Sequence, residues 1–164
     1  MACALWARAD NTDTIAEGSG WRELKNGYVY TVTGNPTITG ENGYSALDVA
    51  LNATVTIYIP EGHTLTLKGS DSNGTRGGAA GIYLRNGSTL VLTGGGKVIA
   101  TGGKAGNGSG GGNGSSASMD YDHTTAGTGG NGGAGGGGAG AGIGGSGVGV
   151  RLVSRRTSLM VGTI

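Results

Sequence analysis

Apolar and polar side chains alternate along short stretches in the middle of the chain. In TVTIYI, residues 54–59, every second residue is Val or Ile, and HTLTL, residues 63–67, repeats the alternation with Leu. A period of two residues is typical of a half-buried β-strand. No segment shows a helical period of comparable strength. The pattern therefore predicts an all-β protein.

A unit of strand, corner and strand occurs twice. Residues 57–69 read IYIPEGHTLTLKG and residues 82–94 read IYLRNGSTLVLTG, so the two copies share Ile, Tyr, Gly, Thr, Leu, Leu and Gly at matching places. Each copy turns at a Gly-containing corner. The unit could be a β-hairpin, but recurrence at periods of roughly 20–50 residues is typical of solenoids, so we favour a parallel solenoid in which each repeat forms one coil.

Stacking the two copies directly on each other predicts which residues lie side by side. In this preferred register, outward-facing Tyr58 would lie beside Tyr83, and Thr64 beside Thr89, at the spacing of adjacent strands. A rival register places Leu47 against Ile82 and keeps the apolar pattern with fewer identities, and we rank it second. The inward pairs of the preferred register are Ile57 with Ile82, Ile59 with Leu84, Leu65 with Leu90, and Leu67 with Leu92.

Further strands extend the pattern to about three rungs. An earlier coil places Tyr30, Val32 and Ile38 inward, and residues 70–81 bulge outward as a loop. A third side of the coil is expected at Leu47 and Val49 and again at Val98 and Ala100. The chain then divides into residues 1–27, an N-terminal cap with Trp21 and Leu24 over the opening or else a signal remnant; 28–101, the rungs; 102–149, a glycine-rich tract; and 150–164, a basic tail.

Most of the 40 glycines fall in the tract at residues 102–149. Two prolines in the whole chain exclude a collagen triple helix. Glycine loses more conformational entropy on ordering than any other residue, so we expect a largely irregular, flexible loop. The alternative is a bundle of extended polyglycine chains, which glycine permits because it has no side chain.

Charge and cysteine content exclude several classes of protein. A formal net charge of +1 gives no reason to expect nucleic acid or an anionic membrane as partner. Cys3 is the only cysteine, so no intrachain disulfide can form. The longest apolar runs are much shorter than the roughly 18 residues of a membrane-spanning helix, so no membrane insertion is expected.

Three stretches together carry a resemblance to a known group of proteins. VTIYIPEGHTLTLKG, GIYLRNGSTLVLTGGGKVIATGG and GAGIGG resemble segments of bacterial exported pectate-lyase-like β-helix surface proteins, over about residues 28–145. The resemblance implies a right-handed parallel β-helix and an extracellular or cell-surface location, with an adhesin or carbohydrate-binding role. We expect the chain to be a fragment of a larger repeat protein that can associate end to end. The basic tail departs from the pattern.

The titratable residues favour a non-catalytic protein. Glycan-cleaving enzymes need clustered carboxylates, but Asp48, Glu61 and Asp71 fall on different sides or corners of the expected coil. His63 occupies a corner position where the repeat has Ser88, so it is interpreted as a turn residue. The sequence therefore indicates no catalytic cluster.

Candidate binding residues fall into two groups. Tyr58 and Tyr83 form a ladder on which a sugar could stack, while Thr64 and Thr89 would contribute to a short threonine array. The second group lies in SMDYDHTTAG, where Asp120, Asp122 and His123 could hold a divalent metal such as calcium and Tyr121 could stack on a sugar. An exposed polar loop is the alternative for that segment.

Three functions are compatible with these features. A structural or adhesive surface module ranks first, because the sequence is dominated by stacked strands and glycine. A module that binds or degrades polysaccharide ranks second, with host or cell-surface glycans as partners. Ice binding through the threonine array ranks third.

Overall fold

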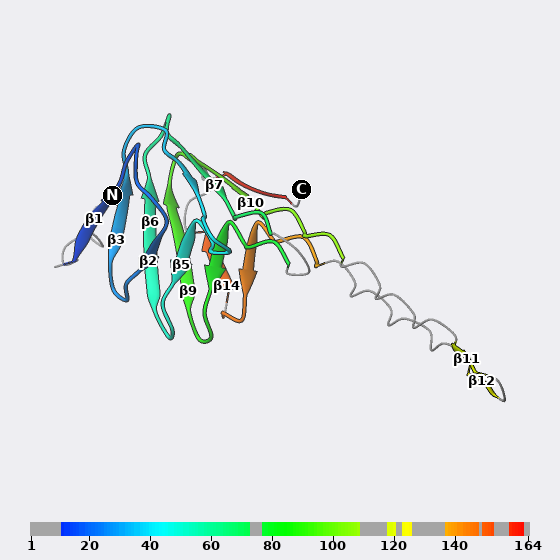
Figure 1. The fold of residues 1–164 in the computed structure, drawn as a ribbon. Helices are drawn as coiled ribbons and strands as arrows, with labels where there is room; N and C mark the ends of the chain where they lie inside the picture. Colours follow the sequence, from blue (N-terminus) through cyan, green and yellow to red (C-terminus); the bar gives the residue numbers. More distant parts are fainter. Residues whose placement is uncertain are drawn as a thin grey trace, which may run out of the picture.

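All regular secondary structure among the described residues is β-strand (Figure 1). The strands form three parallel sheets and one antiparallel two-stranded ribbon. The prediction of an all-β protein with parallel strands is confirmed. The computed structural model describes residues 11–72, 77–108, 118–120, 123–125, 137–147, 149–152 and 158–162.

Each parallel sheet contains strands from widely separated parts of the chain. Sheet A consists of β1 (Thr12–Ile15), β3 (Val29–Val32), β6 (Thr54–Ile59), β9 (Thr89–Gly94) and β14 (Gly149–Leu152). Sheet B consists of β2 (Arg22–Leu24), β5 (Leu47–Val49), β8 (Ile82–Leu84) and β13 (Ile143–Gly145). Sheet C consists of β4 (Thr37–Thr39), β7 (Thr64–Lys68), β10 (Lys97–Thr101) and β15 (Ser158–Gly162). The ribbon pairs β11 (Ser118–Asp120) with β12 (His123–Thr125).

The chain visits the three sheets in a fixed order. From β2 to β10 it passes through sheets B, A and C three times in succession, and β13, β14 and β15 repeat this order once more. Strands from successive visits are hydrogen-bonded neighbours, and every such pair is parallel. The sheets therefore extend beyond residues 28–101 in both directions, because β1 and β2 precede that range and β13 to β15 follow it.

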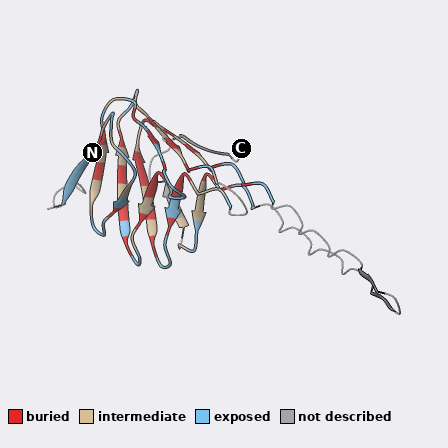
Figure 2. Cartoon of the chain, viewed as in Figure 1, coloured by how far each residue is buried: buried red, intermediate tan, exposed pale blue. Residues whose placement is uncertain are grey.

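The core consists of the inward-facing residues of the three sheets. Buried and more exposed residues alternate along the strands, as in β6 and β7, and Figure 2 shows the buried positions recurring from strand to strand. Burial of each Val, Ile or Leu side chain stabilises the fold by about 1.5–3 kcal/mol. The predicted inward residues are all confirmed as buried: Tyr30, Val32, Ile38, Leu47, Val49, Val55, Ile57, Ile59, Leu65, Leu67, Ile82, Leu84, Leu90, Leu92, Val98 and Ala100.

The preferred register is wrong, and the rival register holds between β5 and β8. Leu47 in β5 pairs with Ile82 in β8, as the second-ranked register predicts. The same offset joins β6 to β9, where Ile57 pairs with Leu92 rather than with Ile82. In sheet C the offset is slightly smaller, and Leu65 pairs with Val98. The remaining predicted pairs, Ile59 with Leu84, Leu65 with Leu90 and Leu67 with Leu92, each join residues of different sheets.

The two similar stretches of sequence contain two different corners of the fold. Gly62 turns the chain from sheet A to sheet C, whereas Gly87 turns it from sheet B to sheet A. Both glycines have positive φ, at 82° and 70°, a conformation that a side chain disfavours. Asn52 occupies the corresponding place one coil before Gly87, also with positive φ. The repeated motif therefore marks corners between sheets, and the two copies mark different corners.

The predicted third side of the coil also fails in part. Leu47 and Val49 belong to sheet B, while Val98 and Ala100 belong to sheet C, so they do not form one side. Each of the three passages from β2 to β10 supplies one strand to each of the three sheets.

The expected cap residues also behave differently from each other. Leu24 is buried in the core, as a residue covering an opening would be. Trp21, by contrast, is 45% exposed on the outer surface. The strands β1 and β2 that surround them are members of sheets A and B. Most of the expected cap is therefore part of the stacked sheets.

Glycine-rich segments next to sheets B and C are joined to one another through their backbones. We name residues 69–72, 77–81, 102–106 and 137–142 the glycine-packed segments. Ala79 N–H donates to the carbonyl of Ser70 at 3.0 Å, Gly103 N–H to that of Ala79 at 2.8 Å, and Gly140 N–H to that of Gly103 at 2.9 Å. Figure 1 shows these runs, coloured green, yellow-green and orange, leaving the sheets side by side.

The close approach of these segments requires glycine. A Cβ at Gly103 would overlap the carbonyl of Ser70, and one at Gly102 would overlap the carbonyl of Gly140. The flexible-loop interpretation is therefore wrong for residues 102–106 and 137–142, which are packed and hydrogen-bonded. Residues 70–72 and 77–81, expected as a bulging loop, belong to the same arrangement.

The end of the chain also joins the sheets. Residues 149–152 form β14 beside β9, and residues 158–162 form β15 beside β10. Of the three arginines of the predicted basic tail, Arg151 lies in β14. Arg155 and Arg156 lie outside the described residues.

Candidate functional site

The tyrosine and threonine pairs predicted from the preferred register are separated in the structure. Tyr58 lies in sheet A between Thr31 and Thr93, whereas Tyr83 lies in sheet B beside Asp48. Thr64 lies in sheet C beside Lys97, and Thr89 lies in sheet A beside Thr54. The expected tyrosine ladder and threonine array are therefore not formed.

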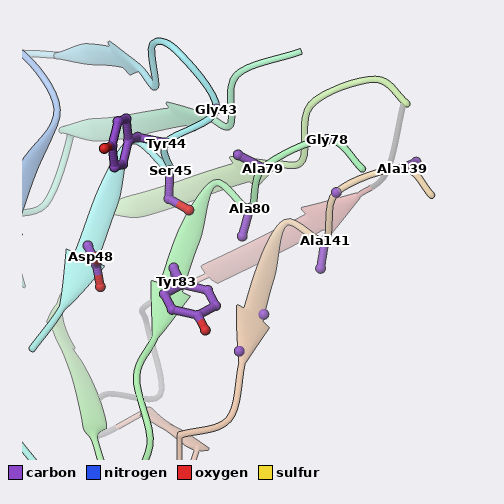
Figure 3. A pocket seen from close by; sticks show the side chains of 13 residues that line it. Gly43, Tyr44, Ser45, Asp48, Gly78, Ala79, Ala80, Tyr83, Ala139 and Ala141 are labelled. Carbon is purple, nitrogen blue, oxygen red and sulfur yellow. The ribbon is translucent and has the colours of Figure 1, made fainter. Parts of the chain in front are cut away.

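A groove lies instead along the outer face of sheet B. Its volume is about 440 Å³, and its polar walls come from Tyr44, Ser45, Asp48 and Tyr83 (Figure 3). Ligand sites in proteins typically measure about 300–1,000 Å³. The groove is thus large enough for a short stretch of a polymer.

Strand geometry presents Asp48 and Tyr83 to this groove. In β5 and β8 the first and last residues of the strand are buried, so the central residue, Asp48 or Tyr83, faces outward. The two are in direct register, and the next strand places Gly144 beside Tyr83. Because Gly144 has no side chain, the flank of the Tyr83 ring stays open, and Tyr83 is 39% exposed.

A second aromatic group lies at one end of the groove. Tyr44, which lines the groove, stacks on Trp21 with ring centroids 5.0 Å apart and planes inclined by 7°. The two rings are 55% and 45% exposed. Stacking fixes the orientation of both rings at little entropic cost, since each has only two side-chain torsions. The groove is therefore lined by two exposed aromatic side chains, Tyr83 and Tyr44, and Trp21 holds the ring of Tyr44.

The facing wall of the groove is made by the glycine-packed segments. Ala79 and Ala80 from one segment and Ala139 and Ala141 from another line it. In Figure 3 the methyl groups of Ala80 and Ala141 lie on the same side as the Tyr83 ring. A wall of small residues leaves the aromatic rings accessible. Sheet B and the glycine-packed segments therefore form the groove together.

An ion pair holds the carboxylate of Asp48. Arg85 donates from Nε to both oxygens of Asp48, at 3.0 and 3.2 Å, and from Nη2 to one of them at 2.8 Å. Arg85 Nη2 also lies 2.9 Å from Glu23 Oε2. The pKa of Arg85 is raised, chiefly by its hydrogen bonds to Asp48 and by the charge of that carboxylate. Exposed pairs of this kind contribute at most about 1 kcal/mol to stability, so their main effect is to orient Asp48.

The metal site predicted in SMDYDHTTAG is only partly described. Asp120 and His123 are backbone partners in the antiparallel ribbon. Asp122 and Tyr121 lie outside the described residues. Within the described part of the chain, no three His, Cys, Asp or Glu side chains gather in an arrangement that would hold a metal ion.

His63 is held at a corner, as the sequence predicts. Its Nδ1 lies 2.7 Å from the carbonyl oxygen of Gly34, which lies between β3 and β4. The neighbouring Thr64 N–H donates to Asn35 Oδ1 at 2.8 Å. These contacts join the corner between β6 and β7 to the corner between β3 and β4 and give His63 a structural role.

Tyr83 is recognisable from the sequence, but the residues that surround it in the groove are not. The preferred register places Asp48 away from Tyr83, whereas the register of the structure puts the two side by side. The stacking of Trp21 on Tyr44 has no signal in the sequence, because the two residues belong to a strand entry and a corner in neighbouring coils.

Comparison of the chain with protein-family models, with curated proteins and with solved structures finds no match. Among the residues that the structure describes, no helix has the length and apolar character needed to cross a membrane.

Proposed function

We propose that the chain is a short right-handed parallel β-helix that acts as a non-catalytic adhesive module at a bacterial cell surface or outside the cell, and that it attaches to polysaccharide through the groove on sheet B. The repeated order of visits to sheets B, A and C supports the β-helix, since each coil then adds one strand to each side. Parallel crossovers are almost always right-handed, which supports the hand.

The observation that carries the binding function is the placing of exposed aromatic rings along one groove. Tyr83 and Tyr44 line the groove, Tyr44 is stacked on Trp21, and Asp48 lies beside Tyr83. The C–H groups of a sugar ring pack against an aromatic face, while its hydroxyl groups donate to a carboxylate. Aromatic faces joined by hydrogen-bond acceptors thus match a polysaccharide chain.

The state of Asp48 favours binding over catalysis. Both of its oxygens accept hydrogen bonds from Arg85. A general acid or base must exchange a proton with the substrate, and a carboxylate held on both oxygens by a guanidinium is poorly placed to do so. Asp48 is better suited to orienting hydroxyl groups of a bound sugar.

Retention on insoluble polysaccharides tests this function. The full chain is mixed with cellulose, chitin, mannan, β-1,3-glucan and insoluble polygalacturonate, and the bound fraction is measured after sedimentation. We expect retention on at least one polymer without release of reducing ends, and retention about fivefold weaker for Tyr83→Ala, because stacking on an aromatic ring is worth roughly 1 kcal/mol.

Tyr58→Ala is the matched control, because it removes an outward tyrosine from sheet A instead of sheet B. It should bind as the wild-type chain does, with both variants compared by circular dichroism. The proposal is wrong if the wild-type chain is retained on none of the polymers, if it releases reducing ends, or if Tyr83→Ala binds undiminished.

A further inference from the structure

Two carboxylates lie side by side on the face that carries the groove. Glu23 in β2 is in direct register with Asp48 in β5. Adjacent strands are about 4.8 Å apart, so these side chains emerge close together. Asp48, with 18% of its side chain exposed, lines the groove, and Glu23 is 46% exposed beside it.

Arg85, the cation beside these carboxylates, already pairs with both of them. Arg85 Nε and Nη2 donate to Asp48, and Nη2 also contacts Glu23. Two carboxylates and one guanidinium leave a net charge of −1. No Lys or Arg occurs among the described residues that line the groove. The site therefore presents an excess of negative charge to a ligand.

This charge pattern opposes acidic polysaccharides. Proteins that bind sugar carboxylates use Arg or Lys, and the strongest sites use the paired donors of a free guanidinium. In the groove the paired donors of Arg85 face Asp48, and a uronate would meet that carboxylate at short range. A neutral sugar brings only hydroxyl groups, which donate hydrogen bonds to the carboxylate and to the tyrosine oxygens.

We propose that the groove selects an uncharged hexose polymer and discriminates against its uronate counterpart, through Glu23 and Asp48. This selectivity rests on the proposed function, since it requires that the groove bind polysaccharide. The selecting group is the pair of carboxylates, with Arg85 positioning Asp48.

The test compares polymers that differ only in charge. Cellulose, mannan and β-1,3-glucan are each used in neutral form and after oxidation of part of their primary hydroxyl groups to carboxylates, with polygalacturonate as a fully acidic polymer. At low ionic strength we expect at least roughly fivefold stronger retention on the neutral form, the size of one unit-charge repulsion at about 4 Å in water. The difference should shrink in 1 M NaCl, where the screening length falls to about 3 Å.

Removal of the two carboxylates tests their role directly. In the double variant Glu23→Gln and Asp48→Asn, Arg85 becomes unpaired and the local net charge changes from −1 to +1, so the preference should invert toward the oxidised polymer. Glu61→Gln, which removes a carboxylate at a corner between sheets A and C, should keep the wild-type preference.

The possible outcomes separate the two proposals. Equal or stronger retention of the wild-type chain on the oxidised polymers, or retention on polygalacturonate alone, overturns the selectivity while the adhesive function stands. An unchanged preference in the double variant also overturns it. Retention of the wild-type chain neither on these polymers nor on chitin overturns the adhesive function and the selectivity together.

Discussion

The sheets and the glycine-packed segments are held together in opposite ways. In the sheets, neighbouring strands bury Val, Ile and Leu side chains between them, and Leu67, Ile57 and Leu92 are completely inaccessible to solvent. In the glycine-packed segments the backbones approach so closely that a single Cβ at Gly103 would overlap a carbonyl. One region is stabilised by side-chain volume, and the other by its absence.

This difference teaches that glycine content alone does not distinguish order from disorder. Glycine loses the most entropy on folding, but segments with no side chains can bring each N–H to a neighbouring carbonyl, as Gly78, Gly103 and Gly140 do. The two regions should consequently respond in opposite directions to the same chemical change: removal of methyl groups damages the sheets, and addition of one damages the glycine-packed segments.

The largest effect is expected from a cavity in the sheets. Leu67 in β7 pairs with Ile38 in β4 and with Ala100 in β10, so Leu67→Ala leaves a void between three strands. We expect the free energy of unfolding to fall by about 2–5 kcal/mol, measured by chemical denaturation. Thr66→Ala, the adjacent outward position, should cost less than about 1 kcal/mol. A similar loss for both variants would show that the core is not closely packed.

A smaller loss is expected from an added methyl group in the glycine-packed segments. Gly103→Ala forces the backbone of Ser70 away, and such overpacking costs about 1–3 kcal/mol. Amide hydrogen exchange should accelerate first at Ala79, whose N–H donates to the Ser70 carbonyl that the added methyl group would displace. The matched control is Gly138→Ala, where a Cβ meets no atom within 4 Å, and its effect should stay within about 0.5 kcal/mol. Equal tolerance of both substitutions would mean that the glycines are not needed for packing.

The smallest effect is a dependence on pH confined to the glycine-packed segments. The pKa of Asp71 is lowered, chiefly because its carboxylate accepts a hydrogen bond from Lys104 N–H at 2.9 Å, with Lys68 also contributing. A lowered pKa in the folded state gives stability that is present above the unfolded pKa of about 3.9 and is lost as the pH falls through the folded value.

Hydrogen exchange at pH values between 6 and 3 checks this expectation. Protection of the Lys104 amide should fall toward pH 3 relative to that of the buried strands, after correction for the intrinsic exchange rate. Asp71→Asn should abolish this relative fall. A relative fall that persists in Asp71→Asn would assign the pH dependence to another group.

Side-chain orientation in the sheets was predictable from the sequence, whereas strand pairing was not. Every residue that the two-residue period predicts to face inward is buried, because alternation is a local property of a strand, although buried Ile15, Ala46 and Ala53 were not among those predicted. The register depends on how much chain each coil uses, and β7 is followed by residues 69–81 before β8 begins. Matching corners at Gly62 and Gly87 gave the stronger identities and so favoured the wrong register.

The groove could be predicted only in part for the same reason. Tyr83 was recognisable as an outward aromatic residue, and the correct register would have added Asp48. The wall formed by Ala79 and Ala141 depends on backbone hydrogen bonds between segments far apart in the chain, such as that from Gly81 N–H to Ala141 O. Small residues carry no hydrophobic period, so no pattern in the sequence places them beside sheet B.

The wide separation in sequence between β9 and β14, which are neighbours in sheet A, has a consequence for how the fold assembles. Thr89 pairs with Thr54 on one side and with Gly149 on the other. The chain from Thr89 to Gly149 is longer than the chain from Thr54 to Thr89, but by less than a factor of two. Since the entropy of closing a loop grows with the logarithm of its length, the longer connection costs only about 0.5 kcal/mol more. Sheet A can thus gain β14 at little extra entropic cost, and the strands from β1 to β10 can pair during synthesis before β14 has left the ribosome.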